Sequence, residues 1–160
     1  MRAIALEVTW RMTTSGSHYA RSFLMHRNAL MSVLERIPAD QAGFKAWEGG
    51  MSFLRLTDHL SGSIMRLNAM LQGQTPAKIE PSADWAAALE RMKLSTADAS
   101  VLLEGLDEET LKRVIPIFGT HMPIASMVDF LIAHETHHKG QIWMMARMID
   151  LEPPMFVKIG

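Results

Sequence analysis

The alternation of apolar and polar positions along the chain predicts four helices, over residues 17–37, 51–71, 83–104 and 123–150. In each segment apolar side chains recur three or four positions apart, which places them on one face of a helix. Breakers follow three of the segments: Pro38, Gly73 and the pair Pro153-Pro154. Ser82 or Asp84 can cap the third helix, and Pro123 suits the first position of the fourth.

The apolar faces of these helices form the predicted core. In the first two helices they comprise Tyr19, Phe23, Leu30, Val33, Leu34, Ile37, Phe53, Leu56, Thr57, Leu60, Ile64, Leu67 and Leu71. In the last two they comprise Trp85, Ala88, Leu89, Met92, Ala99, Leu103, Ile124, Val128, Leu131, Ile142, Met145 and Ile149. Four apolar faces of this length favour an all-α fold, a four-helix bundle.

The remaining segments read as connections. Residues 1–16 lack a helical period and are interpreted as a tail or an added strap, so the single predicted domain spans residues 17–156. A long polar linker follows the second helix, over residues 72–82. Residues 113–122 are apolar and can form two short extended pieces around a turn, but Pro116 argues against a central strand. No segment predicts a sheet convincingly.

Composition narrows the class of protein. The chain has 160 residues, 48% of them hydrophobic and 21% charged, which suits one globular domain. The net charge of −1 gives no reason to expect nucleic acid as a partner. Glu7 interrupts the apolar run at the N-terminus and no run is long enough for a membrane span, so we expect a cytoplasmic protein without a signal peptide or a membrane partner. The sequence contains no cysteine, which excludes thiolate ligands and nucleophiles.

The run His134-Glu-Thr-His-His138 carries most of the chemical information in the sequence. His134 and His138 are four positions apart, so on a helix their rings lie one turn apart and can share a metal ion. His138 falls in the middle of the apolar face of its helix and His134 on the flank, whereas His137 turns away. A buried imidazole needs a partner, since an unsatisfied polar group costs about 1–3 kcal/mol. Two such histidines favour metal ligation over a pair of core histidines.

An open metal site needs a third protein ligand. His59 lies at the edge of the apolar face of the second helix, and His26 lies nearer the centre of the apolar face of the first. Spacing alone does not choose between them. His18 and His121 lie near predicted loops, where exposure to solvent is expected.

Three neighbours of the pair are also candidates for a role. Glu135 is a general base if the site activates water, and otherwise a helix charge or a partner of a ligand. Gln141 can hold a ligand ring or face a substrate. Gly140 inside a helix costs ~1 kcal/mol relative to Ala, so a close helix contact or the approach of a ligand is expected there.

Two known kinds of metal site fit the remaining sequence poorly. His-Glu-x-x-His is the pattern of zinc proteases, but the extended form of that motif places Gly and His where this chain has Gln141 and Met144. A downstream glutamate ligand has only Glu152 as a candidate. A di-iron bundle needs a second Glu-x-x-His, which the sequence lacks.

Over residues 18–156 the chain resembles the DinB/YfiT-like superfamily of metalloenzymes. The resemblance rests on His134-Glu-Thr-His-His138-Lys-Gly-Gln141, on His59 within Leu56-Thr-Asp-His59-Leu60, and on four helices with a long connection between the second and third. Lys139 stands where the motif more often has Arg. The resemblance implies a DinB-like four-helix bundle, frequently a homodimer, with one divalent metal held by His59, His134 and His138.

The resemblance also implies metal-dependent chemistry on a small molecule, as an S-transferase that uses a low-molecular-weight thiol or as a hydrolase. Imidazole ligands suit zinc or nickel, and also iron, manganese or copper. Any thiol has to be a cosubstrate, because the chain has none. The alternatives are a bundle that binds metal without turnover and, less favoured, a zincin-like hydrolase. Glu135 and Gln141 are the catalytic candidates.

Overall fold

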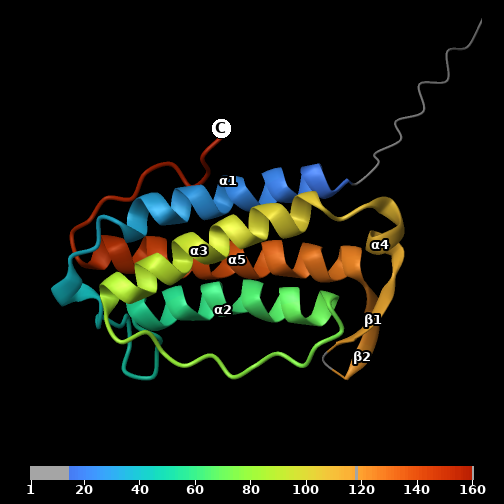
Figure 1. The fold of residues 1–160 in the computed structure, drawn as a ribbon. Coiled ribbons are helices and arrows are strands. Elements are labelled where there is room, and N and C mark those ends of the chain that lie inside the picture. The colour runs from blue at the N-terminus through green and yellow to red at the C-terminus, as the bar shows by residue number, and fades with distance from the viewer. Residues whose placement is uncertain (1–14, 118, 160) are drawn as a thin grey trace, which may run out of the picture.

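Four long helices make up most of the molecule. The computed structural model describes residues 15–117 and 119–159. The helices are α1 (Gly16–Leu34), α2 (Phe53–Leu71), α3 (Trp85–Glu104) and α5 (Ile124–Met148). Figure 1 shows them side by side, and contacts join α1 to α3, α3 to α2, α2 to α5 and α5 back to α1. The prediction of an all-α four-helix bundle is confirmed. In the described part of the chain, no helix combines the length and apolarity that a bilayer crossing requires.

Short polar side chains cap the start of three of these helices, and the sequence predicted a polar cap for one of them, α3. Ser15 accepts a hydrogen bond from the His18 amide at 3.3 Å, and Ser52 accepts one from the Arg55 amide at 3.3 Å. Asp84, one of the two predicted caps of α3, accepts from the Ala87 amide at 2.8 Å. Pro123 precedes α5 rather than beginning it, because its backbone is still extended. The predicted tail of residues 1–16 lies, up to residue 14, outside the described residues.

A β-hairpin between α3 and α5 corrects the expectation that no segment forms a sheet, and it agrees with the alternative of two short extended pieces around a turn over residues 113–122. The short helix α4 (Glu108–Lys112) leads into β1 (Val114–Ile117), which pairs antiparallel with β2 (Thr120–Pro123). Pro116 is tolerated because both strands of a two-stranded sheet are edges, so a missing N–H can face outward. Gly119 in the turn has a φ of 75°, a conformation that glycine adopts without strain.

The connection between α2 and α3 runs back along the bundle, so these two helices point in the same direction (Figure 1). Asp58 on α2 holds the end of this connection that leads into α3. The Asp58 carboxylate accepts from the Ser82 amide at 2.8 Å, from the Ser82 hydroxyl at 2.6 Å and from Arg91 Nη1 at 2.9 Å. Ser82 therefore anchors the linker and does not cap α3.

The predicted core is confirmed, with Leu71, Leu89 and Ile149 only partly buried. It divides into two apolar clusters, one at each end of the bundle. Between the two clusters along the helices lie buried polar side chains contributed by all four long helices: Arg27, Ser61, Ser95, Glu135 and His138. We call these five residues the polar layer. They interrupt the apolar packing at the level of the His134–His138 motif.

Candidate metal centre

His59, His134 and His138 form one cluster at the contact between α2 and α5. The Nε2 atoms of His59 and His134 lie 2.8 Å apart, and the ligand atoms of all three lie within 4.8 Å of one another. The ring centroid of His138 is 4.7 Å from that of His59 and 4.5 Å from that of His134. The three residues that the resemblance implies as ligands are therefore brought together.

The rival ligand, His26, lies elsewhere. Its Nδ1 atom is 2.9 Å from Nζ of Lys139, which also donates to the carbonyl oxygen of Phe156. Helix packing explains why His59 and not His26 joins the cluster. His59 on α2 lies against His134 on α5, whereas His26 on α1 contacts the side of α5 that carries Lys139. His18 and His121 are exposed, as predicted, and so is His137.

The environment keeps the three clustered imidazoles neutral. Burial lowers the pKa of His134 to about 4, assisted by the neighbouring His138, His59 and Arg66. Burial also lowers the pKa of His59, with smaller contributions from His138 and Arg66. The pKa of His138 is lowered mainly by burial, although its hydrogen bond to Gln141 opposes the shift. Neutral imidazole is the form that binds a metal ion.

Gln141 fixes the orientation of one ring. Its Oε1 atom lies 2.7 Å from His138 Nδ1, and an amide oxygen can only accept. Nδ1 of His138 therefore carries the proton and Nε2 is left with its lone pair. Metal-bound histidines commonly donate their second N–H in this way. Gln141 thus lies where the sequence prediction of a residue that holds a ligand ring requires it.

Glu135 lies in the polar layer and faces Arg27. The carboxylate accepts from Arg27 Nε at 2.6 Å and from Nη2 at 2.8 Å, and both side chains are inaccessible to solvent. Because Arg27 engages both oxygens, the geometry offers no support for the general-base role considered for Glu135. Sequence reasoning overlooked Arg27. The available signal was a charged residue between Phe23 and Leu30 on the apolar face of its helix.

The three histidines fit a divalent metal ion in donor type and spacing. Imidazole nitrogens bind zinc at ~2.0–2.1 Å, so two of them on a tetrahedral ion lie ~3.3 Å apart. The spacing is compatible with that value, since Nε2 of His59 and Nε2 of His134 are 2.8 Å apart and the ligand atoms of all three residues lie within 4.8 Å of one another. The expected ligand set is thus geometrically able to hold one ion.

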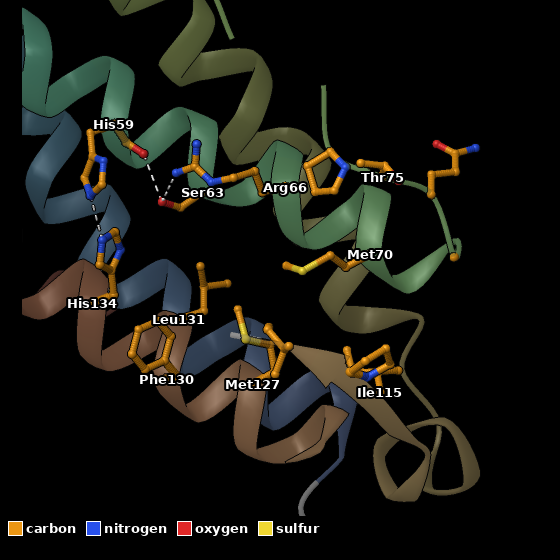
Figure 2. A pocket seen from close by; sticks show the side chains of 15 residues that line it. His59, Ser63, Arg66, Met70, Thr75, Ile115, Met127, Phe130, Leu131 and His134 are labelled. Carbon is orange, nitrogen blue, oxygen red and sulfur yellow. Dashed lines mark hydrogen bonds between the residues drawn. The ribbon is translucent and has the colours of Figure 1, made fainter. Parts of the chain in front are cut away.

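A cavity of about 670 Å³ opens beside the cluster. His59 and His134 form part of its wall, as Figure 2 shows, and side chains of α2, α5 and β1 form most of the rest. A cavity of this size accommodates a small organic molecule. The candidate metal centre therefore borders a space in which a substrate fits.

These observations define a class: an all-α bundle with three histidines of two adjacent helices able to hold one metal ion. The family model described as DinB family matches residues 12–158 of this chain. The chain belongs to the DinB family, which confirms the resemblance seen in the sequence.

Two individual proteins are similar to this chain in sequence over most of its length. The chain is 28% identical over 130 residues to the uncharacterized protein YjoA of Bacillus subtilis (strain 168), covering 78% of this chain and 84% of YjoA. It is 26% identical over 142 residues to the uncharacterized protein YrdA of the same organism, covering 86% of this chain and 84% of YrdA.

Solved structures share the fold. The crystal structure of the DinB-like protein YjoA of Bacillus subtilis matches with a TM-score of 0.76 and 27% identity, covering 88% of this chain and 97% of that one. A DinB-like protein from Bacillus cereus ATCC 10987 matches with a TM-score of 0.73 and 18% identity, covering 86% of this chain and 94% of that one. The second likeness shows the fold alone.

Proposed function

We propose that this protein is a metal-dependent enzyme for a small molecule, and that His59, His134 and His138 bind one divalent ion. The observation that supports the proposal most is the position of the cluster. Three neutral imidazoles converge beside a cavity of about 670 Å³, and those of His59 and His134 form part of its wall. Three protein ligands leave coordination positions open, which distinguishes a catalytic site from a closed structural site.

Zinc or nickel is the favoured ion, because imidazole nitrogen suits both. When bound, such an ion lowers the pKa of a thiol or a water molecule, and so produces a nucleophile near neutral pH. The residues of the chain have separate tasks in this scheme. Gln141 keeps the proton of His138 on Nδ1, and the cavity positions the substrate and limits access of water.

Transfer to a thiol and hydrolysis are the two reactions that suit the site. The chain has no cysteine, so thiol transfer uses a low-molecular-weight thiol as cosubstrate. Thiol transfer is the favoured reaction, since a cavity of this volume can hold both a thiol and an electrophile. A homodimer and a cytoplasmic location stay predictions.

Metal content of the purified protein tests the site directly. We expect about one ion per chain by mass spectrometry in the wild-type protein, and its loss in the His59→Ala and His138→Ala variants. His26→Ala is the matched control, since it removes a half-buried histidine outside the cluster and keeps the metal. A wild-type protein that takes up no ion, even after reloading with zinc or nickel, contradicts the proposal.

Turnover separates an enzyme from a metal-binding bundle. The zinc- and nickel-loaded proteins are incubated with a small thiol and an electrophile, and separately with a set of activated esters. Product formation that requires the metal and disappears with His138→Ala supports catalysis. Full metal occupancy without any turnover supports the bundle that only binds metal.

A further inference from the structure

The cavity beside the three histidines carries a single formal charge. Most of its described lining is apolar: Met70, Pro76, Ile115, Pro116, Ile117, Met127, Phe130 and Leu131. The described polar residues of the wall are Ser63, Gln74, Thr75, His59, His134 and Arg66. Among them Arg66 alone has a permanent charge, because both histidines are neutral. The wall therefore combines an apolar surface with one fixed cation.

Arg66 is held in place close to the histidines. Its Nη2 atom donates to Ser63 Oγ at 3.1 Å, and Ser63 in turn donates to the carbonyl oxygen of His59 at 2.9 Å. Figure 2 shows this chain of contacts along one side of α2, facing the cavity. The charge also reaches the cluster, since Arg66 contributes to the lowered pKa of both His59 and His134.

The packing of α2 also limits where the guanidinium can lie. A side chain at Gly62 would meet Ile79 Cδ1 at 2.9 Å and Arg66 Nη1 at 3.2 Å. The linker and Arg66 thus both lie against the bare backbone of Gly62. Within residues 15–117 and 119–159, Arg66 makes one side-chain hydrogen bond, to Ser63, and no ion pair. A guanidinium has five N–H donors, so most of those of Arg66 have no acceptor among the described residues.

We propose that this cavity is a binding site for a small molecule with an apolar body and one anionic group, and that Arg66 binds the anion. A carboxylate is the simplest group that matches the two-pronged geometry of guanidinium. The apolar body packs on Met70, Ile115 and Met127, and the molecule reaches toward His59 and His134. This inference names the substrate class of the proposed enzyme, and its relevance to catalysis rests on the proposed function. The binding of the anion by Arg66 needs no metal.

A pair of matched probes tests the inference. Calorimetry measures the binding of 3-phenylpropanoate and of its uncharged analogue 3-phenylpropanamide to the full-length protein, both metal-free and zinc-loaded. In the wild-type protein we expect the carboxylate to bind at least about tenfold more tightly than the amide, since hydrogen bonds between two charged groups are stronger than those to a neutral group. In the metal-free Arg66→Met protein the preference falls to within about threefold, while affinity for the amide is unchanged.

Two further variants are controls. Arg55→Met makes the same change at an exposed position of the same helix, outside the cavity, and keeps the preference. Arg66→Lys retains a cation and should keep part of the preference for the carboxylate. Unchanged affinity for the amide shows that Arg66→Met is folded.

A wild-type protein that binds the carboxylate no better than the amide, or not at all, overturns the inference. So does a preference that survives in the metal-free Arg66→Met protein, where no bound ion can attract the carboxylate. The metal-free arm separates this result from the proposed function. A preference that depends on Arg66, in a protein that takes up no metal, supports the anion site and rejects the metal enzyme.

Discussion

Arg27 and Glu135 form a two-pronged ion pair in the middle of the bundle, with N–O distances of 2.6 and 2.8 Å. The pair joins α1 to α5 one residue from His134. Arg27 Nη1 also lies 3.3 Å from both the Ser95 and the Thr96 hydroxyl oxygens of α3. The ion pair that contains the glutamate of the His-Glu-x-x-His pattern therefore links three helices, with Arg27 making the contacts to α3.

Removing one member of this pair is expected to destabilise the fold strongly. Arg27→Met leaves Glu135 buried without its partner, and breaking such a pair costs about 3–5 kcal/mol. Urea unfolding measures the loss. Lys78→Met is the control, because Lys78 and Glu80 form an ion pair with side chains 83% and 71% exposed, worth less than about 1 kcal/mol. Equal effects of the two substitutions would show that the buried pair contributes nothing special.

Glu135→Gln separates the structural role from the general-base role. We expect lower stability in urea but about one metal ion per chain, because Glu135 is not a ligand of the cluster. Any metal-dependent turnover should fall only as far as the folded fraction falls. Complete loss of turnover in a folded, metal-loaded variant would instead favour the zincin-like mechanism.

Gln141→Leu is expected to weaken metal binding without removing a ligand. The substitution deletes the acceptor that lies 2.7 Å from His138 Nδ1, and loss of such a partner costs about 10–100-fold in metal affinity. Competition with a chelator of known affinity gives the change. The exposed His137, replaced by Ala, should change the affinity little. An unaltered affinity in Gln141→Leu would exclude the proposed orienting role.

Acidification is expected to release the metal and to weaken the metal-free fold. The pKa of each clustered histidine is lowered, that of His134 to about 4, so the neutral ligand set persists below the ordinary value of 6.5. Metal retained at pH 7.5 should be lost as the pH falls toward 4. Gel filtration at stepped pH followed by metal analysis checks this, and full retention at pH 4 counts against an all-histidine site.

Proton uptake by the unfolded chain determines how the free energy of unfolding changes with pH. Below pH 6.5 the unfolded chain binds protons at these histidines while the folded chain does not, so the free energy of unfolding decreases as the pH falls from 6.5 toward 4. Urea midpoints of the metal-free protein at pH 7.5 and 5 measure the decrease. The His134→Ala variant should show a smaller decrease than the wild-type protein.

The surroundings of Gly140 and Gly62 predict unequal effects of the same substitution to Ala. The expectation that Gly140 allows a close contact is wrong, because a side chain there meets nothing within 4 Å. Gly140→Ala should therefore stabilise α5 by about 0.5–1 kcal/mol. Gly62→Ala should stabilise α2 less than this, since its new Cβ would lie 2.9 Å from Ile79 Cδ1 and the Ile79 side chain has to shift. Thermal unfolding compares them, and a loss of stability in Gly140→Ala would contradict the open environment.

The sequence by itself determined the helices and their inward faces. A helical repeat is local, so spacing alone places Phe23, Leu60 and Met92 on the apolar faces of their respective helices. The same repeat placed His134 and His138 one turn apart and turned His137 outward. Resemblance to a family, rather than spacing, selected His59.

Only the tertiary structure decided which helices meet. His26 and His59 lie on similar faces of different helices, and the packing of α2 against α5 brings His59 alone to the pair. The partner of Glu135, the Arg66 side of the cavity and the β-hairpin with Pro116 depend in the same way on segments distant in the chain. Periodicity states which face of a helix is buried, but the neighbour that covers this face depends on the packing of the whole chain.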